Sequence, residues 1–86
     1  MHRASSRFWT QFANLPEEVQ KVARKNFELL KDDPSHPSLH FKKVGKLWSV
    51  RAGISHRALA LEEGGDFIWI WIGSNDEYSR VIKQQA

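Results

Sequence analysis

The spacing of apolar residues changes near residue 38, and this change constrains the fold more than any other feature of the chain. Before residue 38, apolar side chains recur every three or four residues, as on one face of a helix. After it they recur every second residue, as on one face of a strand. Helices followed by a run of strands are typical of the α+β class, in which helices cover one face of a sheet.

The first part predicts two helices. One covers residues 6–14, where Phe8, Trp9 and Phe12 share a helical spacing. The second starts at 15–18, because proline suits the first helical position and two glutamates favour the positive end of the helix dipole. It ends at 32–34, where a proline follows two aspartates. Its apolar stripe should pack on the sheet, and comprises Val19, Val22, Ala23, Phe27 and Leu30.

The second part predicts four strands, over 40–44, 47–52, 56–62 and 66–72, with glycines at the turns between them. Short turns imply an antiparallel order. Residues 67–72 are apolar on both faces, as in a central strand. Ser74 followed by Glu77 is a capping box that opens a short C-terminal helix. We predict a single α+β domain over 1–86, with two N-terminal helices packed on a four-stranded antiparallel sheet.

Composition excludes several classes of protein. The 86 residues contain no cysteine, so neither disulfides nor thiolate chemistry contribute. No apolar run approaches the ~20 residues that span a bilayer, and the basic N-terminus lacks the apolar run of a signal peptide. A cytoplasmic location is the simplest expectation. His36 and His40 are four apart, but Pro37 lies between them and no third ligand is evident. We expect neither a metal nor a small-molecule cofactor.

Charge is unevenly distributed along the chain, although the net charge is only +3. No Asp or Glu occurs between Asp33 and Glu62. The cations of this interval are Lys42, Lys43, Lys46, Arg51 and Arg57. A surface of one sign favours an anionic partner, and a phosphate polymer is the first candidate. The alternative is a solvated strand surface whose counter-charges come from the helices.

A hairpin around Gly53 places Arg51 opposite Arg57. Like charges that face each other across a ladder destabilise it by roughly 0.2–1 kcal/mol, so an anion between them would be favourable. The same register pairs Trp48 and Val50 with alanines, which leaves an apolar surface on which a helix can pack. The alternative is that the two arginines extend separately into solvent at the sheet rim.

Several short segments occur in the order seen in the RelE/ParE toxin superfamily, which this chain resembles from about Arg7 to Lys83. They are Leu15-Pro16-Glu17-Glu18-Val19-Gln20, Asp33-Pro34, Phe41-Lys42-Lys43-Val44-Gly45, Trp48-Ser49-Val50-Arg51, His56-Arg57 and Ile72-Gly73-Ser74 through Glu77-Tyr78. The resemblance implies the toxin of a type II toxin–antitoxin pair, bound by a protein antitoxin. The RelE-like branch consists of metal-independent endoribonucleases (mRNA interferases) that cleave mRNA on the ribosome. The ParE-like branch inhibits DNA gyrase, and a degenerate member would only bind partners.

The resemblance assigns roles to the basic residues. Cleavage by an RNA 2′-hydroxyl needs a base, cations for the phosphoryl charge and an acid for the leaving oxygen. By resemblance Arg51 and Arg57 bind the phosphate. An arginine cannot be the base. Lys43 or Lys46 is our candidate base, since neighbouring cations lower a lysine pKa. Lys42 joins them in binding RNA.

Three further positions bear on catalysis. Tyr78 matches an aromatic residue of the superfamily that stacks on a base or orients substrate, or it packs inward with the last helix. Asn75 stands where many relatives carry histidine or a basic residue, and an amide cannot give up a proton. His56 is an alternative acid, but its neighbour Arg57 should point to the opposite face, which favours a rim or core histidine.

Three aromatic residues in the apolar strand, Phe67, Trp69 and Trp71, are expected on one face of it. Such a row could stack nucleobases. Core packing, or a patch covered by the antitoxin, is the preferred interpretation.

Overall fold

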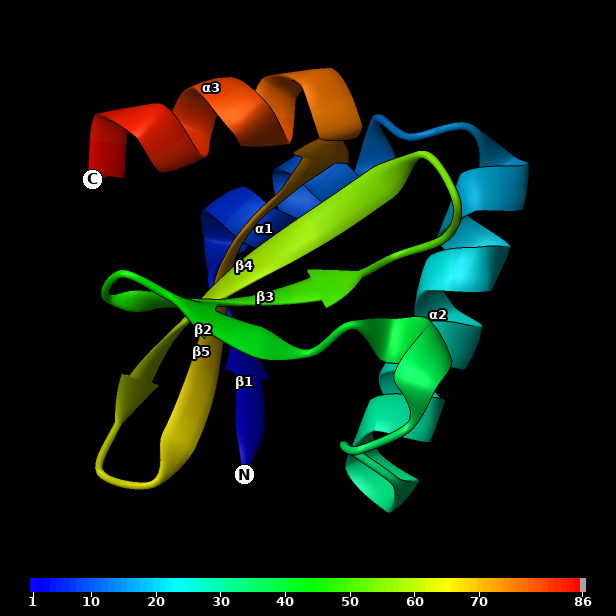
Figure 1. The fold of residues 1–86 in the computed structure, drawn as a ribbon. Coiled ribbons are helices and arrows are strands. Elements are labelled where there is room, and N and C mark those ends of the chain that lie inside the picture. Colours follow the sequence, from blue (N-terminus) through cyan, green and yellow to red (C-terminus); the bar gives the residue numbers. More distant parts are fainter. Residues whose placement is uncertain (86) are drawn as a thin grey trace.

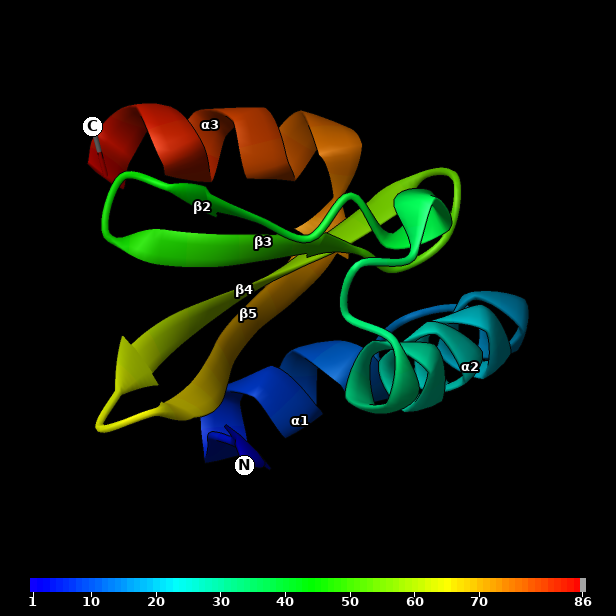
Figure 2. The ribbon, with the colours of Figure 1, turned by 60° about the horizontal axis from the view of Figure 1, so that its bottom comes forward.

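A central sheet separates two helical layers in the computed structural model, which describes residues 1–85. One face of the sheet carries α1 (Ser6–Ala13) and α2 (Glu17–Asp32), and the other carries α3 (Asn75–Gln85) (Figure 2). The strands are β1 (His2–Ala4), β2 (Lys42–Val44), β3 (Leu47–Arg51), β4 (His56–Glu63) and β5 (Asp66–Ser74). A short 3₁₀ helix, η1 (Pro37–Leu39), joins α2 to β2 (Figure 1). The α+β class is confirmed.

Both N-terminal helices form where predicted. The Ser5 hydroxyl accepts a hydrogen bond from the Phe8 N–H at 3.1 Å and so caps α1. Pro16 precedes the first residue of α2. Ala23 and Leu30 of the α2 stripe are buried in the main core, and Phe27 packs against it. Val22 is the exception: it is 43% exposed, because it lies toward the Gly53 turn rather than over the sheet.

The sheet has five strands rather than four, in the order β1-β5-β4-β3-β2. The four predicted strands are antiparallel, as expected, but β1 pairs in parallel with β5 and makes the sheet mixed. A three-residue strand has no alternation to detect, so the sequence gives no sign of it. With β1 on its outer side, β5 is an internal strand, which its apolar sequence predicted.

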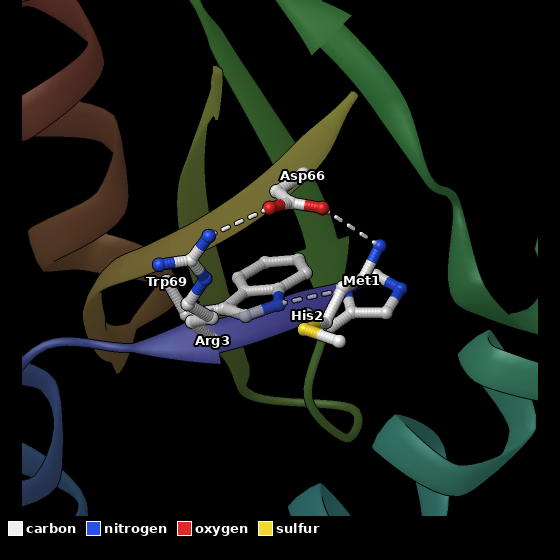
Figure 3. Close-up of polar contacts among 5 residues, drawn as sticks. All are labelled: Met1, His2, Arg3, Asp66 and Trp69. Atoms are coloured by element: carbon white, nitrogen blue, oxygen red, sulfur yellow. Dashed lines mark hydrogen bonds and ion pairs between the residues drawn. The ribbon is translucent and has the colours of Figure 1, made fainter. Parts of the chain in front are cut away.

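Polar contacts from β5 hold β1 in place (Figure 3). The Arg3 guanidinium and the Met1 amino group lie 2.8 and 3.1 Å from the two carboxylate oxygens of Asp66. The indole N–H of Trp69 donates to Nδ1 of His2 at 3.1 Å. The His2 ring also stacks on Phe67. Burial, followed by the charges of the Met1 amino group and Lys31, lowers the pKa of His2.

A bulge in β5 corrects the prediction for its aromatic residues. Leu59 pairs with Trp71 and Ala60 with Trp69, so Ile70 has no partner in β4. The extra residue reverses the alternation. Trp69 therefore lies in the core under α1 and α2, with Phe67 packed against that core, whereas Trp71 packs under α3. The three rings do not form one row.

The C-terminal helix starts with the predicted capping box. The Glu77 N–H donates to the Ser74 hydroxyl at 3.2 Å, and Glu77 Oε1 accepts from the Ser74 N–H at 3.1 Å. The helix then crosses the sheet from the β3–β4 turn toward the β2–β3 turn (Figures 1 and 2). Its apolar side packs on a small second core that comprises Leu47, Leu59 and Trp71.

Candidate functional site

The predicted pairing of Arg51 with Arg57 is confirmed by the register of β3 and β4. Alternation along both strands places the two arginines on the face that α3 covers. On that face Leu47 and Leu59 pack beneath α3, while Val50 and Ala58 belong to the core on the other face. Both arginines are half-buried at the end of the hairpin.

Tyr78 of α3 lies beside this pair. The Arg57 guanidinium carbon is 5.1 Å from the centre of the Tyr78 ring, a cation–π geometry. The same ring packs against the second core together with Val81 and Ile82. Tyr78 therefore combines the two arrangements that the sequence allowed: an inward-facing residue of α3 and an aromatic ring beside the arginines.

In the part of the chain that the structure describes, no carboxylate forms an ion pair with either arginine. Among residues 1–85, the ion pairs involve Met1 and Arg3 with Asp66, and Lys31 with Glu28. Glu77, at the start of α3, is held by Ser74. The hydrogen bonds from the Ser74 N–H and hydroxyl keep the pKa of the Glu77 carboxyl below its usual value. The paired cations are thus left with their mutual repulsion, which an anionic ligand would relieve.

The lysines are distributed differently from the expectation. Lys42 pairs with Ser49, two residues before Arg51, so it lies on the arginine face. Diagonal neighbours of this kind are roughly 7–8 Å apart, which is the separation expected between Lys42 and Arg51. Lys43 pairs with Trp48 and therefore belongs to the opposite face. Lys46 sits in the turn before β3, about 17 Å from Arg51 at a strand rise near 3.4 Å. The expectation that Lys43 or Lys46 stands beside the arginines is not met.

Asn26 positions the end of β3 and was missed by sequence reasoning. Its side-chain amide donates to the carbonyl oxygen of Arg51 at 3.0 Å. A signal was available, because Asn26 lies three residues after Ala23 and four before Leu30, on the stripe of α2 that faces the sheet. A polar residue on an apolar stripe needs a hydrogen-bond partner when it is buried.

Asn75 joins the start of α3 to the β3–β4 turn. The Asn75 backbone N–H donates to the carbonyl oxygen of Ser55 at 2.9 Å. The Asn75 side-chain amide donates to the carbonyl oxygen of Ile54 at 3.2 Å. Its Oδ1 is buried without a partner in the part of the chain described. The side chain thus links the start of α3 to the turn next to the arginine pair, and its amide is engaged there.

His56 lies at the rim of the sheet, as expected. It lines a small groove with Val19 and Val22 of α2, away from the face of Arg57. Its Nδ1 is 2.9 Å from the Ser55 hydroxyl.

Ser49 is fully buried between the cations and the second core, and its hydroxyl has no partner among the described residues. This hydroxyl lies beneath the arginine face and is not open to a ligand in this conformation. Gly73 pairs with Arg57, and a Cβ there would lie 2.6 Å from the Trp71 ring. The Trp71 ring and the Glu77 carboxylate fill the space beside this backbone, so only glycine fits there.

Within residues 1–85 there is no group of three His, Cys, Asp or Glu side chains able to hold a metal. No helix in the described part of the chain is long and apolar enough to cross a membrane. The polar groups on the arginine face are two arginines, one lysine and a tyrosine, above a buried serine. Such a set can bind and polarise a phosphodiester.

The sequence matches no protein-family model and no curated protein. The fold does match solved structures. A chain of the RelB–RelE antitoxin–toxin complex from Methanococcus jannaschii has a TM-score of 0.71 at 14% identity, over 92% of this chain and 96% of that one. The isolated RelE toxin of E. coli has a TM-score of 0.62 at 12% identity, over 98% and 96%. A copper-bound mutant toxin from Helicobacter pylori has a TM-score of 0.57 at 19% identity, over 88% and 94%. This chain has the fold of the RelE toxins.

Proposed function

We propose that this chain is the toxin of a type II toxin–antitoxin pair and acts as a metal-independent endoribonuclease on mRNA at the ribosome. The observation that carries the proposal is the Arg51–Arg57 pair, in which Arg57 lies against Tyr78 and neither arginine has a carboxylate partner among residues 1–85. The shared fold with solved RelE toxins supports the same function.

In this proposal the arginines stabilise the charge that builds on the phosphate as the 2′-hydroxyl attacks it. A preorganised donor of this kind contributes about 10²–10³ in rate. Tyr78 holds Arg57 and offers a ring edge to a nucleobase. Because Lys42 shares the arginine face, it takes the role of base, while Lys43 and Lys46 contact phosphates further along the RNA.

The partners follow from the same proposal. A RelB antitoxin accompanies RelE in the complex from Methanococcus jannaschii. We propose that a protein antitoxin likewise binds this chain, and that both act in the cytoplasm with ribosomes and mRNA as targets.

A second candidate is a toxin of the ParE type that inhibits DNA gyrase without cleaving RNA. Asn75 favours it, because the Asn75 amide is engaged with Ile54 and cannot supply a proton to a leaving group. A family member that only binds partners is the remaining alternative.

The experiment is induction of the chain alone, followed by two assays on purified protein. The proposal predicts growth arrest, and cleavage of mRNA by the purified chain in a reconstituted translation system. Supercoiling by gyrase should be unaffected. Inhibition of gyrase with intact mRNA would replace the proposal by the ParE alternative. Normal growth at confirmed soluble expression would leave only partner binding.

A further inference from the structure

A cavity of about 310 Å³ lies between α1, α2 and the sheet, on the face opposite the paired arginines. Its walls are mostly apolar. They include Phe8 and Phe12 of α1, Phe27 of α2, and Val50, Trp69 and Ile72 of the sheet. The cavity is partly open to solvent, with the half-exposed ring of Trp9 among its lining residues.

Small residues create this space. Ala23 of α2 and Ala52 and Ala58 of the sheet all line the cavity, and each is at most 8% exposed. A leucine or valine at any of these positions would occupy part of the volume. At about 30 Å³ per water molecule the space equals roughly ten waters, but its apolar walls offer few hydrogen bonds to them.

The charge at the rim is positive. Arg24 lines the cavity, with its guanidinium carbon 4.9 Å from the Phe12 ring, and forms no ion pair among residues 1–85. The rim also contains Glu28, but this carboxylate lies 3.0 Å from Lys31. The Asn26 amide is engaged with the Arg51 carbonyl. Arg51 also lines the cavity, but strand alternation places its side chain on the α3 face. Of the residues that the structure describes, Arg24 is therefore the charged side chain of the rim that remains available to a ligand.

We propose that this cavity binds a small planar aromatic molecule that carries one anionic group. The volume is at the lower end of the range of about 300–1,000 Å³ for ligand pockets, which suits one or two fused rings. Aromatic walls favour edge-to-face contacts with the rings, and Arg24 would pair with the anion at the mouth. The proposal does not depend on the toxin function: Asn26 and Arg51 also line the cavity, but neither is assigned a contact with this ligand.

The test uses indole-3-acetate and the neutral indole as probes, with two-dimensional NMR of alanine methyl groups. Indole-3-acetate should bind with a dissociation constant on the order of 1 mM. It should shift the methyl signals of Ala23, Ala52 and Ala58, while the exposed Ala13 serves as the internal reference. Shifts spread evenly over surface methyls, or none at all, would overturn the proposal.

Three variants locate the site. Ala23→Leu fills the cavity and should abolish binding of both probes. Arg24→Gln should weaken indole-3-acetate roughly two- to fivefold, the range of an exposed ion pair, and leave indole unchanged. Lys25→Gln is the matched control, since this neighbouring cation is exposed and is not among the lining residues.

Ala58→Val replaces Ala23→Leu if the latter does not fold, because a β-branched residue suits strand β4. Binding that persists in a folded cavity-filling variant would contradict the proposal. So would equal affinity for the two probes in the parent chain, because Arg24 would then have no role.

Discussion

The Arg57 guanidinium lies 5.1 Å from the centre of the Tyr78 ring, so the C-terminal helix supplies one wall of the arginine site. The same ring belongs to the small core beneath α3. Packing and site geometry therefore depend on a single side chain, and two substitutions separate the contribution of its ring from that of its hydroxyl.

Tyr78→Phe keeps the ring and removes only the hydroxyl. We expect its unfolding free energy to lie within about 0.5 kcal/mol of the parent value, and mRNA cleavage to be retained. Tyr78→Ala removes the ring, and should cost about 1.5–2.5 kcal/mol, half of what truncating a fully buried ring costs. Cleavage should fall with it. A Tyr78→Phe variant that melts like the parent but does not cleave would show that the hydroxyl takes part in the chemistry.

Asn26 holds the carbonyl oxygen of Arg51 and should influence activity without touching the substrate. Asn26→Ala should lower the unfolding free energy by about 1 kcal/mol, the net worth of one hydrogen bond, and lower the rate of cleavage. Gln20→Ala is the matched control, because the Gln20 amide donates to the carbonyls of Ala13 and Leu15, far from the arginines. It should lose similar stability and keep full activity. Equal rates in both variants would remove Asn26 from the site.

The contact between His2 and Trp69 predicts a dependence of stability on pH. The folded state lowers the pKa of His2, so the unfolded state binds a proton more readily. This contribution is present above the unfolded pKa, near 6.5, and is lost as pH falls toward the lower folded pKa. Protonation also removes the Nδ1 acceptor of the Trp69 indole.

The measurement is urea unfolding of the parent and of His2→Gln between pH 7.5 and pH 5. The parent should lose stability across this range, and His2→Gln should lose less. The exposed His40, replaced by glutamine, should behave like the parent. The hydrogen bonds of Asp66 with Arg3, and next with the Met1 amino group, lower the pKa of its carboxyl below the usual value. The contribution of Asp66 to stability is therefore lost only at a pH below the range of this measurement. Parallel curves for parent and His2→Gln would contradict the assignment.

The parts of the fold that follow from local sequence were predictable. Gly53 indicated the turn that places Arg51 opposite Arg57. The Ser74–Glu77 capping box indicated where α3 starts. The same argument applied to the turn at Gly45 and Lys46 would have paired Lys42 with Ser49, and so placed Lys42 on the arginine face. That step was available from the sequence.

Other features depend on contacts between distant segments. Strand β1 is three residues long and exists because β5 offers it an edge. The unpaired Ile70 reverses the alternation of β5, and no local pattern distinguishes a bulge from a continuous strand. The hydrogen bond from Asn75 to Ile54 crosses 21 residues, so its role in joining α3 to the turn becomes visible only in the folded chain.

The central claim is that Arg51 and Arg57 bind the phosphate that is cleaved, and Arg57→Ala tests it most directly. The measurement is mRNA cleavage in a purified translation system, beside thermal melts of the same proteins. Arg57→Lys retains charge without the two-pronged guanidinium, and Arg7→Ala removes an exposed cation of α1 as the matched control. We predict that Arg57→Ala cleaves about 10²–10³ times more slowly while melting no lower than the parent, because relief of the opposed charge offsets the loss of the cation–π contact with Tyr78. Arg7→Ala should cleave like the parent. An Arg57→Ala protein that melts lower yet cleaves at the parent rate would contradict the account.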